Sequence, residues 1–234
     1  MELLRFKKGQ KYLIWDFETA NLSLLPCSNG LDNLDTIINM PWQLGWQVYD
    51  GAKLVENHED WIWWECFGSK MGRDAAAITQ FDQSLYERRA KPPEPILERF
   101  NGYLLDPSVI SITANGQNFD LYLYNIYRHL LKRGTDYSWV SRHYDIQVLE
   151  KASILGVAPP PIGTDDWTLF SFKMSGIRKR GMKTSLAHLA QQNGVPYDPN
   201  RHHKEASYDV SLTKGVFDAQ IRKMDIYVGS ESKS

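Results

Sequence analysis

The chain has 234 residues, of which 42% are hydrophobic and 24% charged, and its formal net charge is −1. These proportions are those of an ordinary globular protein, so they exclude a largely disordered chain and predict a sizeable core. The balanced charge excludes a strongly basic nucleic-acid-binding coat, so any polyanion would have to be held by local basic patches or by metal ions.

Cysteine usage and hydropathy bear on the compartment. Cys27 and Cys66 are the only cysteines and stand outside any C-x-x-C pattern, which argues against a thiolate zinc site or a disulfide framework. The N-terminal apolar run is too short and interrupted for a signal peptide, and no uncharged apolar stretch is long enough to span a bilayer. We therefore expect a cytoplasmic protein.

The first part of the chain predicts three strands in an antiparallel meander. The first strand is a short apolar run that leads into Asp16-Phe17-Glu18-Thr19, so carboxylates stand at its end. A loop insertion is expected over residues 21–40, which contain Pro, Asn-Gly and several Asp and Asn residues. Asp50-Gly51 is a hairpin signal between the second and third strands. The predicted strands are residues 12–15, 41–49 and 53–67.

The rest of the chain alternates between predicted helices and strands. Pro92-Pro93 separates the first two helices, Asn115-Gly116 turns the chain after a β-branched strand, and Asn193-Gly194 closes a short helix. The last helix is amphipathic. The predicted helices are residues 74–86, 94–105, 119–131, 185–192 and 207–224, and the predicted strands are 109–114 and 143–149.

The order of these elements implies one α/β domain with a mixed sheet. No internal repeat or linker rich in Pro, Gly or Ser divides the chain. We expect a single domain over residues 1–228 with the insertion near 21–40. The composition of residues 229–234 indicates a tail that is disordered or derived from cloning.

Asp16 and Glu18 are the first candidates for chemistry. Residues two apart on a strand point to the same face, so the two carboxylates lie together and repel unless a cation compensates them. Hard divalent ions such as Mg²⁺ prefer such oxygen ligands. A D-x-E pair is also expected about once by chance in an ordinary chain of this size.

Two further acids stand near predicted helix starts. Asp120 follows the Asn115-Gly116 turn, and Asp209 lies at the start of the last helix. Capping and the helix dipole favour acids at such positions without any catalytic role, so each acid alone is a weak signal.

Together, these motifs resemble the DnaQ-like (DEDD) 3′–5′ exonuclease family. The resemblance rests on D-x-E at Asp16 and Glu18, N-G-x-x-F-D over residues 115–120 and Y-D-V-x-x-T over residues 208–213. Pro41-Trp-Gln-Leu-Gly45 is similar to the family's second strand, and the S-L-A-H-L-A and N-G-V-P stretches within residues 184–196 precede the third motif as in the family. The resemblance implies an RNase H-like fold, with a central mixed five-stranded sheet and helices on both faces.

The family resemblance also implies a chemistry. Four acids would hold two divalent cations, Mg²⁺ or Mn²⁺, and the enzyme would use them to hydrolyse a phosphodiester bond. Asp16 would bridge both ions, Glu18 and Asp209 would hold the ion on the side of the nucleophile, and Asp120 would support the other.

The expected activity is removal of nucleotides from the 3′ end of single-stranded DNA. Three alternatives stay open at this point: a 3′–5′ exoribonuclease, a catalytically impaired nucleic-acid-binding module, and a proofreading subunit that docks on a polymerase in trans. The 2′-hydroxyl contact that separates RNA from DNA enzymes is not readable in the sequence.

The sequence also leaves open which residue activates the attacking water. The family uses His five residues before the last Asp, or Tyr four residues before it, and these positions hold Lys204 and Glu205. His203, or less favourably His202, could reach the site through a one-residue bulge. An unperturbed lysine stays protonated at neutral pH whereas histidine titrates there, so His203 is preferred to Lys204.

The sequence indicates the residues that contact the substrate less clearly than it indicates the acids. The tryptophans of residues 61–64 could stack bases or, as we favour for most of them, serve as core or partner surface. The basic run over residues 177–183 could contact phosphates or be a solvated loop. The positions expected to touch the terminal nucleotide are Phe17, Thr19, Asn115 and Phe119, with core packing favoured for Phe119.

Overall fold

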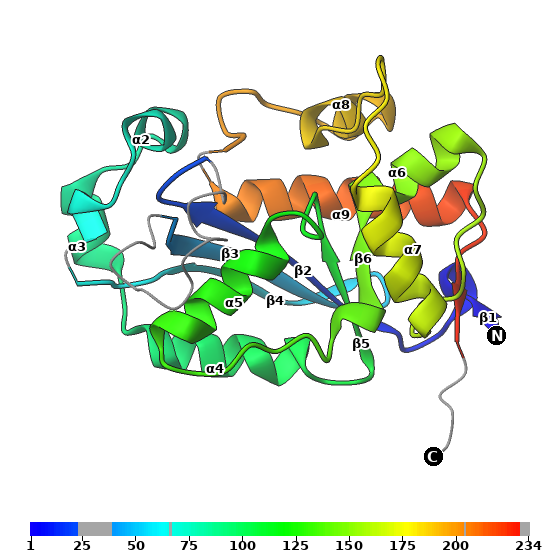
Figure 1. The fold of residues 1–234 in the computed structure, drawn as a ribbon, viewed down its shortest axis with the longest axis horizontal. Helices are drawn as coiled ribbons and strands as arrows, with labels where there is room; N and C mark the ends of the chain where they lie inside the picture. Colours follow the sequence, from blue (N-terminus) through cyan, green and yellow to red (C-terminus); the bar gives the residue numbers. More distant parts are fainter. Residues whose placement is uncertain (23–38, 66, 204, 230–234) are drawn as a thin grey trace.

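A computed structural model describes residues 1–22, 39–65, 67–203 and 205–229. Its strands are β1 (Glu2–Leu3), β2 (Lys11–Thr19), β3 (Pro41–Asp50), β4 (Lys53–Trp61), β5 (Val109–Thr113), β6 (His143–Asp145) and β7 (Tyr227–Val228). Five of them form a sheet in the order β4-β3-β2-β5-β6 (Figure 1). β2, β3 and β4 are antiparallel, whereas β5 and β6 continue from β2 in parallel. The predicted meander and mixed five-stranded sheet are confirmed.

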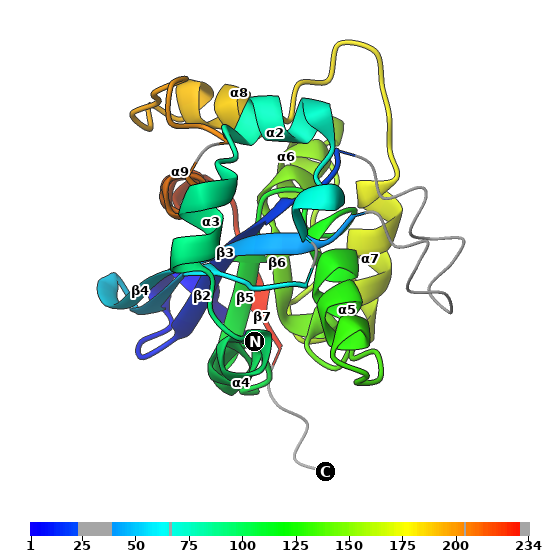
Figure 2. The same cartoon turned by 90° about the vertical axis from the view of Figure 1, so that its left-hand side faces the viewer.

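Helices cover both faces of this sheet. The helices are α2 (Arg73–Thr79), α3 (Gln83–Arg89), α4 (Pro93–Leu104), α5 (Asp120–Leu130), α6 (Ile146–Leu155), α7 (Asp165–Ser175), α8 (Leu186–Gln192) and α9 (Ala206–Lys223), with short 3-10 turns η1 (Leu4–Phe6), η3 (Phe67–Ser69) and η4 (Val140–Arg142). Figure 2 shows α9 and α5 on opposite sides of the sheet, with α2 and α8 across one end. No helix in the described part of the chain is long and apolar enough to cross a membrane.

The central strand β2 divides the core in two. Leu13, Trp15 and Phe17 point into the cluster that packs against α4 and α5. Tyr12 and Ile14 point into the cluster that packs against α6 and α9. Because side chains alternate along a strand, Asp16 and Glu18 lie on the α9 face.

Three predicted elements differ in the structure. The strand predicted over residues 53–67 ends at Trp61, and Phe67 begins the 3-10 turn η3. The helix predicted over residues 74–86 is split into α2 and α3, because Gln80 adopts a left-handed conformation and the Asp82 side chain caps a new helix. The strand predicted over residues 143–149 is wrong after Asp145. There the chain enters α6, and the Asp145 carboxylate accepts the backbone N–H of Gln147 at 2.8 Å, which caps that helix.

Three further elements were not expected from the sequence. α7 begins at the cap residue Thr164 and buries Trp167, whose indole N–H donates to the His143 carbonyl at 2.8 Å. β1 and β7 form a two-residue antiparallel pair that joins the two ends of the described chain. Pairs this short have no period to detect in a sequence.

The predicted insertion and tail lie mostly outside the described residues. Residues 23–38 and 230–234 are not described, nor are Cys27, Cys66 and Lys204. The two ends of the insertion meet, because the N–H of Ala20 donates to the Met40 carbonyl at 3.0 Å. Gly229, the first residue of the predicted tail, donates its N–H to the Ile162 carbonyl at 2.7 Å.

Candidate active site

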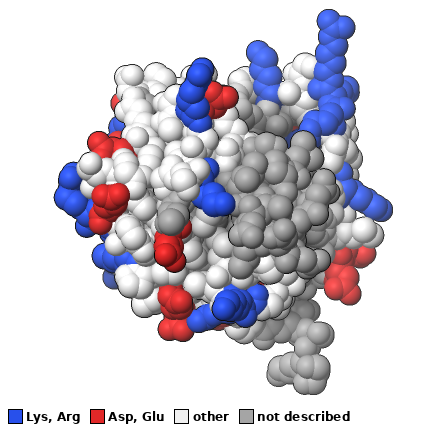
Figure 3. Space-filling view, turned by 60° about the vertical axis from the view of Figure 1, so that its left-hand side comes forward, with Lys and Arg blue, Asp and Glu red and all other residues white. Residues whose placement is uncertain are grey.

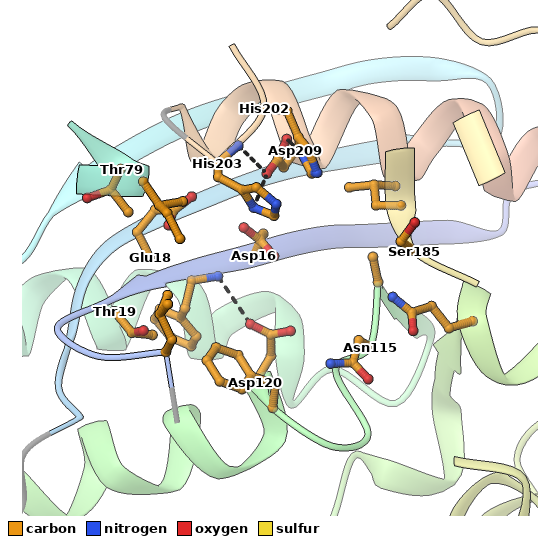
Figure 4. A pocket seen from close by; sticks show the side chains of 17 residues that line it. Asp16, Glu18, Thr19, Thr79, Asn115, Asp120, Ser185, His202, His203 and Asp209 are labelled. Atoms are coloured by element: carbon orange, nitrogen blue, oxygen red, sulfur yellow. Dashed lines mark hydrogen bonds and ion pairs between the residues drawn. The ribbon is translucent and has the colours of Figure 1, made fainter. Parts of the chain in front are cut away.

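The end of β2 brings two carboxylates against the first turn of α9. Asp16 and Glu18 share one face of the strand, and Glu18 is only 7% exposed. Asp209, in the first turn of α9, faces them (Figure 4). One oxygen from each of these three residues lies within 4.8 Å of the other two. Residues from the two ends of the chain thus form one cluster of oxygen ligands.

Gly45 permits this close approach of α9 to the sheet. It pairs with Asp16 across β2 and β3. A Cβ atom at this position would lie 2.5 Å from the carbonyl carbon of Ala206 and 2.7 Å from its oxygen. Because the interior is close-packed, a larger residue would push the start of α9 away. Glycine at position 45 therefore sets the distance between Asp209 and the acids of β2.

Asp120 approaches from the α5 side of β2. It is buried at the N-terminus of α5, and its Oδ1 accepts the backbone N–H of Phe17 at 3.2 Å (Figure 4). The preceding turn is held by Asp145, whose carboxylate accepts the N–H groups of Asn115 and Gln117, each at 3.0 Å. A buried carboxylate with several N–H donors is a rigid anchor, so Asp145 fixes the turn that carries Asp120.

Burial and mutual repulsion raise the pKa values of the buried acids. Burial raises the pKa of Asp16 well above its ordinary value, and the charges of Asp120, Glu18 and Asp209 raise it further. Burial, followed by the charges of Asp209 and Asp120, raises the pKa of Glu18 in the same way. Burial raises the pKa of Asp120 to about 8. A cation held among the carboxylates would oppose both the burial and the repulsion.

The donor set fits divalent cations. Among the described residues that line the pocket there is neither Lys nor Arg, so no permanently charged cationic side chain compensates the acids. The ligand atoms are carboxylate oxygens, which hard cations such as Mg²⁺ and Mn²⁺ prefer. Asp16, Glu18 and Asp209 are close enough to share one ion, and Asp120 lines the same cavity.

Two histidines complete one wall of the pocket. His202 Nδ1 lies 2.7 Å from Asp209 Oδ1, and the backbone N–H of His203 donates to Asp209 Oδ2 at 3.1 Å. The two rings stack with centroids 3.6 Å apart. His203 has φ +63°, so a left-handed turn presents both rings to the pocket. Burial, and then the neighbouring His202, lowers the pKa of His203.

The sequence favours His203 over His202 and Lys204 as the base. The structure brings both histidines to the pocket, whereas Lys204 lies outside the described residues. His203 is the more exposed of the two, and His202 is almost fully covered. The buried contact of His202 with Asp209 had no signal in the sequence, because it depends on the turn at His203.

The acids line a cavity of about 390 Å³, a size typical of ligand sites. Phe17, Thr19, Asn115 and Phe119, predicted as substrate contacts, all line it. The tryptophans of residues 61–64 do not; Trp61 and Trp64 are core, and Trp63 stacks on Tyr86. Further lining residues, none of which was predicted as a substrate contact, are Ile78, Thr79, Ala114, Gln147, Ser185 and Leu186.

The sheet order and the helices on both faces define an RNase H-like α/β fold, as predicted. No protein-family model and no curated protein matches the chain. Solved structures do resemble it. The zinc-bound form of the E. coli ExoI–ssDNA complex superposes with a TM-score of 0.61 at 14% identity, over 92% of this chain and 40% of that chain.

A second neighbour is E. coli exonuclease I in complex with a 5cy-dT13 oligonucleotide. Its TM-score is 0.60 at 16% identity, over 93% of this chain and 40% of that chain. The present chain therefore spans about two fifths of the length of these structures. At this identity the similarity establishes the fold alone.

Proposed function

We propose that this chain is a metal-dependent 3′–5′ exonuclease that removes nucleotides from the 3′ end of single-stranded DNA. The observation that carries the proposal is the convergence of Asp16, Glu18 and Asp209 within 4.8 Å, with Asp120 lining the same cavity. The fold neighbours support it, since they are exonuclease structures with single-stranded DNA. The sequence motifs support the same chemistry.

The acids would hold two divalent cations, Mg²⁺ or Mn²⁺. Asp16, Glu18 and Asp209 would hold the ion on the side of the nucleophile, and Asp16 and Asp120 the other. When bound, such ions lower the pKa of a water ligand and stabilise the charge that develops on the phosphate and the leaving oxygen. The protein's part is to keep its carboxylates fixed, which the Phe17 N–H does for Asp120.

His203 would accept the proton of the attacking water. Its lowered pKa favours the neutral ring that a base requires at neutral pH. His202 would position Asp209 through the contact at 2.7 Å. The terminal nucleotide would lie against Thr19, Asn115 and Phe119, which line the same cavity.

Labelled oligonucleotides test the proposal. DNA and RNA of the same sequence, labelled at either end, would be incubated with Mg²⁺, Mn²⁺ or EDTA. We expect stepwise shortening from the 3′ end of DNA with either metal and none with EDTA. Faster shortening of RNA would redirect the proposal to an exoribonuclease. No shortening of either strand with any metal would overturn it.

A further inference from the structure

A second cavity, of about 590 Å³, adjoins the acidic one. The two share Asn115, Gln147 and Ser185 as lining residues. The second cavity is lined by cations, namely Lys151 on α6 and Arg178-Lys179-Arg180 in the loop between α7 and α8. We call it the cationic pocket. A negatively charged site and a positively charged site therefore share one wall.

The cations of this pocket form no ion pair with a carboxylate within the described residues. Lys151 is only 4% exposed, and its ammonium donates to the Ser175 carbonyl at 2.7 Å. Arg178 donates to the same carbonyl at 2.8 Å, so two cations meet at one neutral oxygen. Burial, and then the charge of Arg178, lowers the pKa of Lys151, and the charge of Asp145 opposes this shift only in part.

A buried cation is costly unless an anion or several hydrogen bonds compensate it. An anion in the cationic pocket would relieve the repulsion between Lys151 and Arg178. Arg and Lys together are the side chains that proteins use to hold phosphate oxygens. Figure 3 shows basic side chains projecting from the top of the molecule, the level at which Figure 1 places the loop between α7 and α8.

We propose that the cationic pocket binds a phosphate of the nucleic-acid strand on the 5′ side of the bond that is cut. The proposal rests on the proposed function, because the direction in which the strand lies follows from removal of nucleotides from its 3′ end. In removal from the 3′ end, only one nucleotide lies beyond the scissile phosphate. Any further phosphate held next to the acidic cavity therefore belongs to the 5′ part of the strand.

A further hollow extends the same path. It shares Lys179, Arg180 and Met182 with the cationic pocket and adds Lys183, although Glu150 also lines it. The basic run predicted over residues 177–183 thus borders a continuous series of cavities that begins at the acids. The cationic pocket holds the strand in register while the terminal nucleotide is hydrolysed.

The double variant Arg178→Ala/Arg180→Ala tests the cationic pocket, with Lys151→Met as a second variant. Lys7→Ala/Lys8→Ala is the matched control, since it removes the same charge from the N-terminal segment. On dT20 we expect KM to rise on the order of tenfold with kcat unchanged, because charged hydrogen bonds to phosphate are removed. On the dinucleotide dTpdT, which has only the scissile phosphate, we expect no change.

Backbone neutralisation locates the phosphate. Oligonucleotides with one methylphosphonate at the second, third or fourth linkage from the 3′ end would be compared. At one of these positions the wild type should bind the neutral linkage more weakly, and the double variant should not discriminate. Equal sensitivity of both proteins at every position would overturn the proposal, as would an equal loss on dTpdT and dT20. If the pocket bound free phosphate instead of the strand, the wild type and the double variant would also respond equally to the methylphosphonate at every position.

Binding without turnover separates this proposal from the proposed function. In EDTA, the affinity for fluorescent dT20 would be measured against salt concentration. The logarithm of the binding constant falls with the logarithm of the salt concentration. The magnitude of this slope should decrease by about 0.7 for each phosphate that the double variant no longer neutralises. This result is expected even if the wild type hydrolyses nothing. An unchanged slope together with unchanged KM would overturn the cationic pocket while leaving exonuclease activity standing.

Discussion

At the scale of single residues, Asp209 is the point where the two parts of the site join. Its Oδ1 contacts His202, its Oδ2 accepts the N–H of His203, and its carboxylate faces the acids of β2. The carboxylate is almost fully buried. Its position is therefore set by the protein before any ligand arrives, which is the requirement for a preorganised site.

Replacing Asp209 by Asn should remove activity without unfolding the chain. The amide keeps the shape but loses the charge that a divalent ion needs. We expect kcat to fall by at least about a hundredfold, with no rescue by raised Mg²⁺ to the wild-type rate. Circular dichroism in EDTA should show an intact fold. Wild-type turnover by Asp209→Asn would exclude Asp209 from the catalytic machinery.

Separate substitution of the two histidines should distinguish their roles. His203→Ala should lower kcat by about two to four orders of magnitude, because it removes the base. His202→Ala should mainly weaken metal binding, seen as a higher Mn²⁺ concentration at half-maximal rate, because Asp209 loses its positioning partner. If His203→Ala keeps full kcat while His202→Ala loses it, the assignment of the base is wrong.

At the scale of elements, the site depends on how closely α9 lies on β3. Ala206 sits over Gly45, and the register of β2 and β3 puts Asp16 beside that contact. The Asp145 carboxylate plays a similar part for α6 and the turn at Asn115. Helix starts position Asp120 and Asp209, whereas the strand β2 positions Asp16 and Glu18.

Gly45→Ala should displace the start of α9. We expect the free energy of unfolding to fall by about 1–3 kcal/mol and metal affinity to weaken, because the added methyl overlaps the Ala206 backbone. Gly102→Ala is the matched control, since its Cβ meets open space in α4. In a helix that change should stabilise the protein by about 0.5–1 kcal/mol. Denaturant unfolding and Mn²⁺ titration would measure both, and equal effects of the two variants would contradict this role of Gly45.

At the scale of the whole molecule, the acidic cluster makes stability depend on pH and on metal. Burial raises the pKa of Asp120 to about 8, and the pKa values of Asp16 and Glu18 are raised as well. A carboxyl with a higher pKa in the folded chain contributes stability that is present below its unfolded pKa of about 4. That stability is lost as the pH rises through the folded value.

In EDTA, the melting temperature should therefore fall as the pH is raised from 5 to 8. Added Mg²⁺ should raise it, and by more at pH 8 than at pH 5, because the ion compensates charges that are fully developed only at the higher pH. Asp120→Asn should flatten the profile in EDTA. Thermal melts across this range would check both effects, and a metal-free profile without slope would refute the coupling.

Local patterns in the sequence were enough to predict most of the elements. An apolar run predicted β2, a β-branched run predicted β5 and alternation predicted β3, and these signals are local because they depend only on neighbours in the chain. Asp16, Glu18, Asp120 and Asp209 were selected from 28 acidic residues by the resemblance of their motifs to a known family, since each acid alone is a weak local signal. The local signals failed at residues 146–149, where the Asp145 cap outweighed a run that is typical of a strand.

Which of these residues meet, and what surrounds them, follows from the assembled fold. The contact of His202 with Asp209, the shared carbonyl of Lys151 and Arg178, and the closeness of α9 at Gly45 all depend on where the chain places its elements. Such contacts leave no periodic trace, since they arise from packing between elements rather than from propensity within one. Charged side chains can act together on a ligand only when the packed core holds them at suitable distances from one another.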